Sequence, residues 1–155
     1  DVGKPKVEAM REYLTEMCPE TEVETIVERF TGAITHRSIV VVCVDSLASR
    51  REILAKLPAI PSRWIVDCRV GGEQIELYAC ESPNVWETTL PDRAGPDRCG
   101  AEFIAYVSQI AGGLVAMQVK KILNCGIFSE KFEKVEQSLI LHLGSLELKK
   151  NLSWR

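Results

Sequence analysis

Two residues have a type and a position that suit chemistry: an aspartate that follows an apolar run, and a cysteine that precedes a long predicted helix. Asp45 comes directly after residues 38–44, which read Ser-Ile-Val-Val-Val-Cys-Val. Open α/β sheets bind ligands at the carboxyl ends of their strands, and a carboxylate there can hold a magnesium ion that bridges phosphates. The alternative interpretation is a helix-capping aspartate before Ser46.

Cys99 lies before the helix predicted at 100–124, with Arg93 and Arg98 close by in sequence. A helix N-terminus and neighbouring cations lower the pKa of a thiol and so favour the reactive thiolate. Glu102, in the first turn of that helix, opposes this effect. Cys99 is therefore either a reactive thiol or a structural one.

The composition is that of a soluble globular protein with 155 residues and a net charge of −3. Its charges form no basic stripe, so we expect no nucleic-acid partner. No run approaches the roughly 18 apolar residues of a membrane span, and no signal peptide is recognisable, so we expect no membrane partner and a cytoplasmic location.

Neither a disulfide framework nor a metal site is expected from the cysteines and histidines. His36 and His142 are too isolated to form a ligand pair. Free thiols inside apolar strands behave as small hydrophobes, which is how we interpret Cys43 and Cys68. The six cysteines are scattered without a C-x-x-C pair, at positions 18, 43, 68, 80, 99 and 125.

In the first half of the chain, the apolar spacing predicts alternating helices and strands. Residues 38–44 are a β-branched run without polar alternation, typical of a central strand that is covered on both faces in a parallel sheet. Ser46 can cap the helix that follows. A tight turn at Gly71-Gly72 joins the last two of these strands. The predicted elements are a helix at 4–18, strands at 22–27 and 38–44, a helix at 47–57, and strands at 63–70 and 74–79.

The second half begins with a predicted surface loop at 81–98, which is rich in charge and proline. The helix at 100–124 is apolar over much of its circumference, so we expect it to be buried or to pack on a partner chain. Residues 139–148 alternate around Gly144-Ser145, which predicts a hairpin with a two-residue turn.

These elements predict an α/β, Rossmann-like fold with a mostly parallel sheet, flanking helices and a C-terminal β-hairpin, in one domain over residues 1–155. Neither G-x-G-x-x-G nor G-x-x-x-x-G-K-[ST] occurs in the sequence. Both motifs place a glycine-rich phosphate turn after a strand. We therefore expect an N-terminally incomplete unit that lacks the nucleotide-binding strand and turn.

Four stretches form an ordered pattern that is more specific than any single motif. They are Asp1-Val2-Gly3-Lys4-Pro5-Lys6, then Cys43-Val44-Asp45-Ser46 with Arg50, then Arg98-Cys99-Gly100-Ala101, and finally Gln118-Val119-Lys120-Lys121-Ile122-Leu123. The pattern resembles the ThiF/MoeB family of adenylating enzymes, which are related to ubiquitin activators. The resemblance covers essentially the whole chain.

The resemblance implies a role for four residues. Lys6 matches the phosphate-contacting lysine of the D-[IV]-G-x-x-K element, Asp45 the magnesium-associated aspartate, and Arg50 an arginine of the ATP site. Cys99 matches the cysteine that links covalently to the C-terminus of a carrier protein. Without the resemblance, Lys6 reads as a solvated lysine in a first helical turn and Arg50 as an exposed helical arginine.

The resemblance also implies ATP and magnesium as cofactors, a ubiquitin-like or sulfur-carrier protein as partner, and a homodimer. Many members of the family hold a zinc ion with two C-x-x-C pairs, which are absent here, so no zinc is expected. Asp67, Arg69 and the Gly71-Gly72 turn receive no role beyond a strand end and a turn.

The leading hypothesis is therefore an adenylyltransferase that activates the C-terminus of such a carrier protein. Because the phosphate turn is missing, we expect the chain alone to bind ATP weakly or not at all and to be inactive. The alternative is a non-catalytic remnant or scaffold that keeps only the fold and the dimer surface. A dinucleotide-binding oxidoreductase is a weaker third candidate, since no fingerprint is present.

Overall fold

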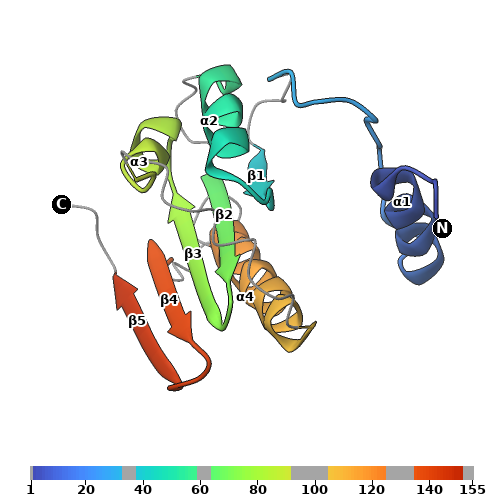
Figure 1. The fold of residues 1–155 in the computed structure, drawn as a ribbon. Coiled ribbons are helices and arrows are strands. Elements are labelled where there is room, and N and C mark those ends of the chain that lie inside the picture. The colour runs from blue at the N-terminus through green and yellow to red at the C-terminus, as the bar shows by residue number, and fades with distance from the viewer. Residues whose placement is uncertain (1, 33–37, 59–63, 92–104, 125–134, 152–155) are drawn as a thin grey trace. The chain divides into compact units, whose positions relative to one another are not determined.

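The chain divides into two compact units, Asp1–Thr31 and Gly32–Arg155. The computed structural model describes residues 2–32, 38–58, 64–91, 105–124 and 135–151 (Figure 1). Helix α1 belongs to the first unit, and the other described helices and strands belong to the second. That residues 1–155 form one domain stays a prediction.

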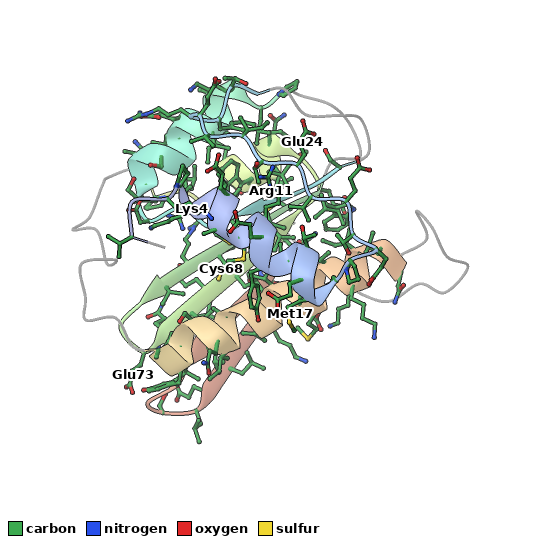
Figure 2. The ribbon with its side chains drawn as sticks, turned by 90° about the vertical axis from the view of Figure 1, so that its right-hand side faces the viewer. Lys4, Arg11, Met17, Glu24, Cys68 and Glu73 are labelled. Atoms are coloured by element: carbon green, nitrogen blue, oxygen red, sulfur yellow. The ribbon has the colours of Figure 1, made fainter. Side chains whose placement is uncertain are left out.

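The first unit is built on α1, Lys6–Met17, close to the helix predicted at 4–18. The carbonyl of Pro5 accepts the first hydrogen bonds of the helix, from the N–H groups of Glu8 and Ala9 at 3.1 Å. The helix ends before Cys18 because Pro19 disfavours the helical conformation of the residue that precedes it. Figure 2 shows Lys4 and Met17 near the two ends of this helix.

The strand predicted at 22–27 does not form. These residues are described, and none of them is in a strand. The alternation of their side chains suits a strand, but a strand also needs a neighbour to satisfy its backbone N–H and C=O groups. The described part of the first unit supplies no such neighbour.

The second unit contains a five-stranded sheet with the order β1-β2-β3-β4-β5. The strands are β1 Ile39–Val42, β2 Trp64–Gly71, β3 Gln74–Cys80, β4 Ser138–His142 and β5 Glu147–Asn151. Three helices accompany them: α2 Leu47–Lys56, α3 Pro83–Glu87 and α4 Ala105–Asn124. The predicted α/β, Rossmann-like class, with its flanking helices and C-terminal hairpin, is confirmed.

The sheet is mixed, so the prediction of a mostly parallel sheet was wrong for the described strands. Only β1 and β2 pair in parallel, whereas β2–β3, β3–β4 and β4–β5 are antiparallel. The parallel pair is the one joined by a helical crossover, α2. The tight turns after β2 and β4 reverse the chain and give antiparallel neighbours.

Strand β1 is also shorter than predicted and is the first strand in the sheet order, not a central one. Among the described strands it pairs with β2 alone. Val41 is 44% exposed, so the strand is not covered on both faces throughout. A β-branched run indicates burial, but it does not reveal which strands lie on either side.

The core lies between the sheet and α4. The main cluster consists of Trp64, Val66, Leu77, Ala79, Ile122 and Leu139. On β3, Ile75, Leu77 and Ala79 lie on one face and are fully buried. Helix α4 is buried along one side only, since Tyr106, Ile110 and Met117 are 36–47% exposed.

The opposite face of the sheet is covered by α2 and α3. Side chains alternate between the faces of a strand, so Asp67 points away from Val66 and Cys68, which pack in the core beside α4. Asp67 contacts Arg50 of α2 and Trp86 of α3 instead. Within the described ranges, every helix is too short or too polar to span a bilayer.

Three connections differ from the predicted ones. Gly71 lies within β2, paired with Gln74, so the turn is at 72–73, where Gly72 has φ +58°. The β4–β5 hairpin has a four-residue loop at 143–146, because His142 pairs with Glu147. The region 81–98 contains a helix, α3, whose cap is Ser82. Residues 92–98 of that region lie outside the described ranges.

Candidate functional site

Asp45 lies between the end of β1 and the start of α2, at the carboxyl end of the parallel pair of strands. Its side chain is exposed. Ser46, not Asp45, is the N-cap of α2, because the Ser46 Oγ accepts a hydrogen bond from the N–H of Ser49 at 3.1 Å. The helix-capping interpretation therefore does not account for Asp45.

A magnesium ion would fit this position. Mg²⁺ is commonly bound by one or two carboxylates, with water and substrate phosphates as its other ligands. The N-terminus of α2 next to Asp45 is suited to phosphate, because its N–H groups and dipole attract anions. Within the described residues, no three Cys, His, Asp or Glu side chains gather into a metal-binding group. Asp45 would therefore be a single carboxylate ligand beside phosphate oxygens.

Arg50 is one turn into α2 and points inward, and it is only 3% exposed. Its Nε donates to Asp67 Oδ1 at 2.9 Å, and its Nη2 donates to the carbonyl of Cys68 at 3.0 Å. It is therefore not the exposed helical arginine of the simpler interpretation. A contact between Arg50 and a phosphate stays a prediction, and these two bonds already occupy part of its guanidinium group.

Asp67 is fully buried and accepts hydrogen bonds at both carboxylate oxygens. In addition to the bond from Arg50 to Oδ1, Oδ2 accepts from Arg69 Nε at 2.8 Å and from Trp86 Nε1 at 2.9 Å. Sequence reasoning missed this cluster. The sequence does contain a sign of it: Asp67 and Arg69 lie two residues apart in an otherwise apolar strand, and residues i and i+2 of a strand share one face.

Arg69 extends the cluster to the residues that follow α3. Its Nη1 donates to the carbonyl of Thr89 at 2.8 Å and its Nη2 to Thr89 Oγ1 at 2.7 Å. The guanidinium lies 4.3 Å from the centre of the Tyr78 ring, in a cation–π contact. Arg51 of α2 donates to the carbonyl of Pro91 at 2.5 Å. Residues 89–91 are thus held by β2 and by α2.

Lys6, the predicted phosphate-contacting lysine, is the first residue of α1 and is exposed. It lies in the first unit, whereas Asp45 and Arg50 lie in the second. Asp45 and Arg50 are close in sequence, before and within the first turns of α2, but Asp45 is exposed and Arg50 points inward. A shared site of Lys6 with these two residues stays a prediction. Next to Lys6, Lys4 forms an exposed ion pair with Glu12 at 2.5 Å.

Cys99 lies outside the described residues, so its predicted reactivity stays a prediction. Burial raises the pKa of Cys68 and of Cys80 to about 12, which keeps both thiols protonated and weakly nucleophilic at neutral pH. Cys43 was expected inside a strand, but it lies beyond the end of β1 and is exposed. Figure 2 shows the Cys68 side chain on the second unit.

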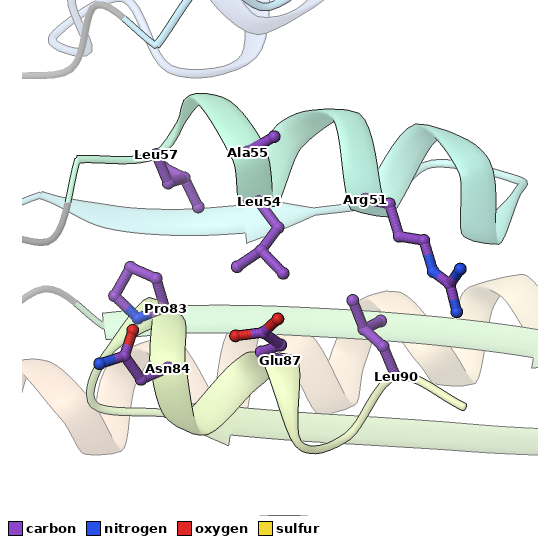
Figure 3. Close-up of a pocket in the computed structure, with 8 residues that line it drawn as sticks. All are labelled: Arg51, Leu54, Ala55, Leu57, Pro83, Asn84, Glu87 and Leu90. Carbon is purple, nitrogen blue, oxygen red and sulfur yellow. The ribbon is translucent and has the colours of Figure 1, made fainter. Parts of the chain in front are cut away.

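A groove separates α2 from α3, with a volume of about 550 Å³. Side chains of both helices face each other across it, as Figure 3 shows. Its lining residues are Arg51, Leu54, Ala55, Leu57, Pro83, Asn84, Glu87 and Leu90. Five of these eight residues are apolar, and Arg51 and Glu87 supply one charge of each sign. Asp45 and Asp67 do not line this groove.

The comparison with known proteins agrees with the pattern of the sequence. A model of the ThiF family matches residues 1–139. The sulfur carrier protein ThiS adenylyltransferase of Escherichia coli (strain K12) is 27% identical over 133 residues, which are 80% of this chain and 53% of that protein. The chain therefore spans about half the length of this relative. Because the family model matches most of its residues, the chain belongs to the ThiF family.

Proposed function

We propose that this chain is part of an adenylyltransferase that activates the C-terminal carboxylate of a sulfur-carrier or ubiquitin-like protein with ATP. The observation that carries the proposal is the position of Asp45 in a ThiF-family chain, exposed at the carboxyl end of β1 and directly before the capped start of α2. The Escherichia coli relative is by its name an adenylyltransferase of the sulfur carrier protein ThiS.

In the proposed reaction, an oxygen of the carrier carboxylate attacks the α-phosphorus of ATP, an acyl-adenylate forms, and pyrophosphate leaves. Bound magnesium would neutralise phosphate charge during this transfer. Asp45 would hold the metal, the N–H groups at the start of α2 would face phosphate oxygens, and Lys6 would add positive charge. The protein thus contributes mainly orientation and charge.

We further propose that Cys99 forms a covalent link to the activated C-terminus of the carrier. The thiolate would attack the acyl carbon of the adenylate, so that a thioester forms and AMP leaves. A helix N-terminus and neighbouring arginines in sequence would favour the thiolate. This step depends on the adenylate and has no role without it.

One observation favours the alternative, a non-catalytic scaffold. Arg50, the predicted ATP-site arginine, is buried and already donates to Asp67 and to the Cys68 carbonyl. A scaffold of this kind would bind the carrier protein and no nucleotide. The two functions therefore differ in whether ATP reaches the start of α2.

The test follows the backbone NMR signals of Asp45, Ser46 and Leu47 in the full chain during a titration with ATP, with and without Mg²⁺. The adenylyltransferase proposal expects weak binding at these residues that Mg²⁺ strengthens. Asp45→Asn should remove the magnesium effect. The matched control is Glu81→Gln, which removes an exposed carboxylate from the same unit and should leave the effect intact.

A second titration uses a sulfur-carrier protein with an intact or a truncated C-terminus. Binding of the intact carrier without any response to millimolar ATP would assign the chain to the scaffold alternative. No response to either ligand would reject both functions for this chain.

A further inference from the structure

One buried carboxylate, that of Asp67, is shared by three separate segments of the second unit. Arg50 reaches it from α2, Arg69 from β2 and Trp86 from α3, at distances of 2.8–2.9 Å. Asp67 and Trp86 are fully buried and Arg50 nearly so. The three donors use both oxygens of the carboxylate, so they fix its orientation as well as its position.

The electrostatics of this cluster make the three contacts interdependent. Two guanidinium groups surround one carboxylate away from water, with side-chain exposures of 3% for Arg50 and 13% for Arg69. An ion left without its partner in such a place is strongly unfavourable, and buried polar networks act as units. Movement of one of the three donors, Arg50, Arg69 or Trp86, therefore disturbs the other two contacts with Asp67.

The contact from Arg50 connects the cluster with Asp45, the candidate magnesium ligand. The backbone N–H of Arg50 donates to the carbonyl of Ser46 at 3.2 Å, and Ser46 Oγ caps the N–H of Ser49. Asp45 is the residue before Ser46. A single helical turn thus connects the side chain that Asp67 holds with the backbone that carries the Asp45 carboxylate.

The contacts from Trp86 and Arg69 connect the cluster with the segment 86–91. Trp86 ties α3 to Asp67, and the carbonyl of Trp86 accepts from both the N–H and the Oγ1 of Thr89. Arg69 donates to Thr89, and Arg51 donates to the carbonyl of Pro91. The cluster therefore fixes the segment 86–91 against β2 and α2.

We infer that Asp67 is a positioning residue, whose carboxylate fixes the start of α2, beside Asp45, relative to the segment 86–91. It touches neither substrate nor metal and acts through Arg50, Arg69 and Trp86. The inference rests on the proposed function in that Asp45 is the catalytic-site residue being positioned. The coupling between the two segments can be tested without that function.

The first experiment measures amide hydrogen exchange in the full chain for Asp67→Asn, with Glu87→Gln as control. Glu87 is an exposed carboxylate on α3 outside the cluster. Under conditions where these amides exchange by local opening, Asp67→Asn should speed exchange about tenfold both at Ser49 and Arg50 and at Thr89 and Leu90, whereas Leu77 and Val107 in the core exchange by global unfolding and report the loss of overall stability. A change in one segment only, or in neither, would overturn the coupling.

If Asp67→Asn does not fold, Trp86→Phe makes the same test more gently. It keeps an aromatic ring in the core and removes the Nε1 donor to Asp67, together with part of the indole volume. The coupling expects faster exchange at Ser49 and Arg50, on the far side of the carboxylate. A change confined to α3 would contradict it.

The second experiment measures how much Mg²⁺ strengthens ATP binding, as the ratio of the two dissociation constants. Asp67→Asn, or Trp86→Phe in its place, should lower this ratio at least severalfold, and Glu87→Gln should leave it unchanged. An unchanged ratio alongside altered exchange would make Asp67 a purely structural residue and overturn the positioning role. If the wild-type chain shows no magnesium effect, the proposed function fails, and the exchange experiment alone decides the coupling.

Discussion

At the scale of single residues, the unusual feature is the amount of charge kept away from water around Asp67. Arg50, Asp67 and Arg69 form two ion pairs, at 2.9 Å and 2.7 Å, with little exposure. Such clusters add less stability than their contacts suggest, because each ion first loses its hydration. They are strongly specific in geometry, however, since no partner can be removed without leaving a buried charge.

The Asp67 cluster gives a stability prediction. Asp67→Asn should lower the free energy of unfolding by about 3–5 kcal/mol, because two buried guanidinium groups lose their anion. Urea denaturation followed by circular dichroism measures it. Glu81→Gln, at an exposed position, should change the value by less than about 0.5 kcal/mol. A loss below about 1 kcal/mol for Asp67→Asn would show that water reaches the arginines.

The buried thiols and Tyr78 give a pH prediction. Burial raises the pKa of Cys68, Cys80 and Tyr78 to about 12, from ordinary values of 9.0 for the thiols and 10.0 for tyrosine. The folded state therefore holds these protons more tightly than the unfolded state, and their contribution to stability is complete below about pH 9 and lost as the pH rises toward 12. Urea unfolding in steps above about pH 9 should show this decline. Cys80→Ala should flatten the slope, and an identical slope would contradict the assignment to that thiol.

Cysteine labelling gives a third prediction at this scale. Cys99 should react first with iodoacetamide at neutral pH, as its sequence context favours the thiolate. Among the described cysteines, exposed Cys43 should react before Cys68 and Cys80, which are protonated and screened. Mass spectrometry of timed samples gives the order. Early labelling of Cys18 or Cys125 with an inert Cys99 would leave Cys99 as a packing residue.

At the scale of elements, α2 is the one that connects the candidate site with the core. Its first turn is capped by Ser46, its Arg50 enters the buried cluster, and its Arg51 holds Pro91. Its far end, with Leu54 and Leu57, lines the groove shared with α3. A short helix thus carries the backbone beside Asp45, faces α3 across the groove and contacts Pro91, which follows α3.

The cap of α2 can be tested by substitution. Ser46→Ala should cost about 1 kcal/mol of unfolding free energy, because the N–H of Ser49 loses its acceptor. Ser46→Asn should restore most of it, since asparagine is an equally good N-cap. Thermal or urea unfolding of both variants makes the measurement. Equal losses in the two variants would mean that Ser46 matters for something other than capping.

At the scale of the whole molecule, we expect self-association. Tyr106, Ile110 and Met117 are partly exposed and lie four and seven residues apart on α4, so they form one apolar stripe. Light scattering at micromolar concentration should give a mass above that of the monomer. Met117→Lys should shift it toward the monomer, and Glu147→Gln on β5 is the control. A monomer mass for the wild-type chain would contradict the prediction.

Local features of the chain were predictable from the sequence alone. The apolar spacing located α1 and α2, and the predicted strand at 74–79 agrees with β3 to within one residue. Ser46 was recognisable as a cap, and the ordered motifs indicated the ThiF family. Periodicity, capping and motif order depend on residues near one another in sequence, so no tertiary information is needed to read them.

Tertiary structure decided what depends on distant neighbours. The segment 22–27 has strand-like alternation but no strand, and β1 reads as central but comes first in the sheet order, because pairing partners come from elsewhere in the chain. From the sequence, Arg50 reads as an exposed helical arginine, and Asp67 has no role beyond a strand end. Only the packing of α2 and α3 on β2 removes them from water and makes them partners, since burial is a property of three-dimensional contacts.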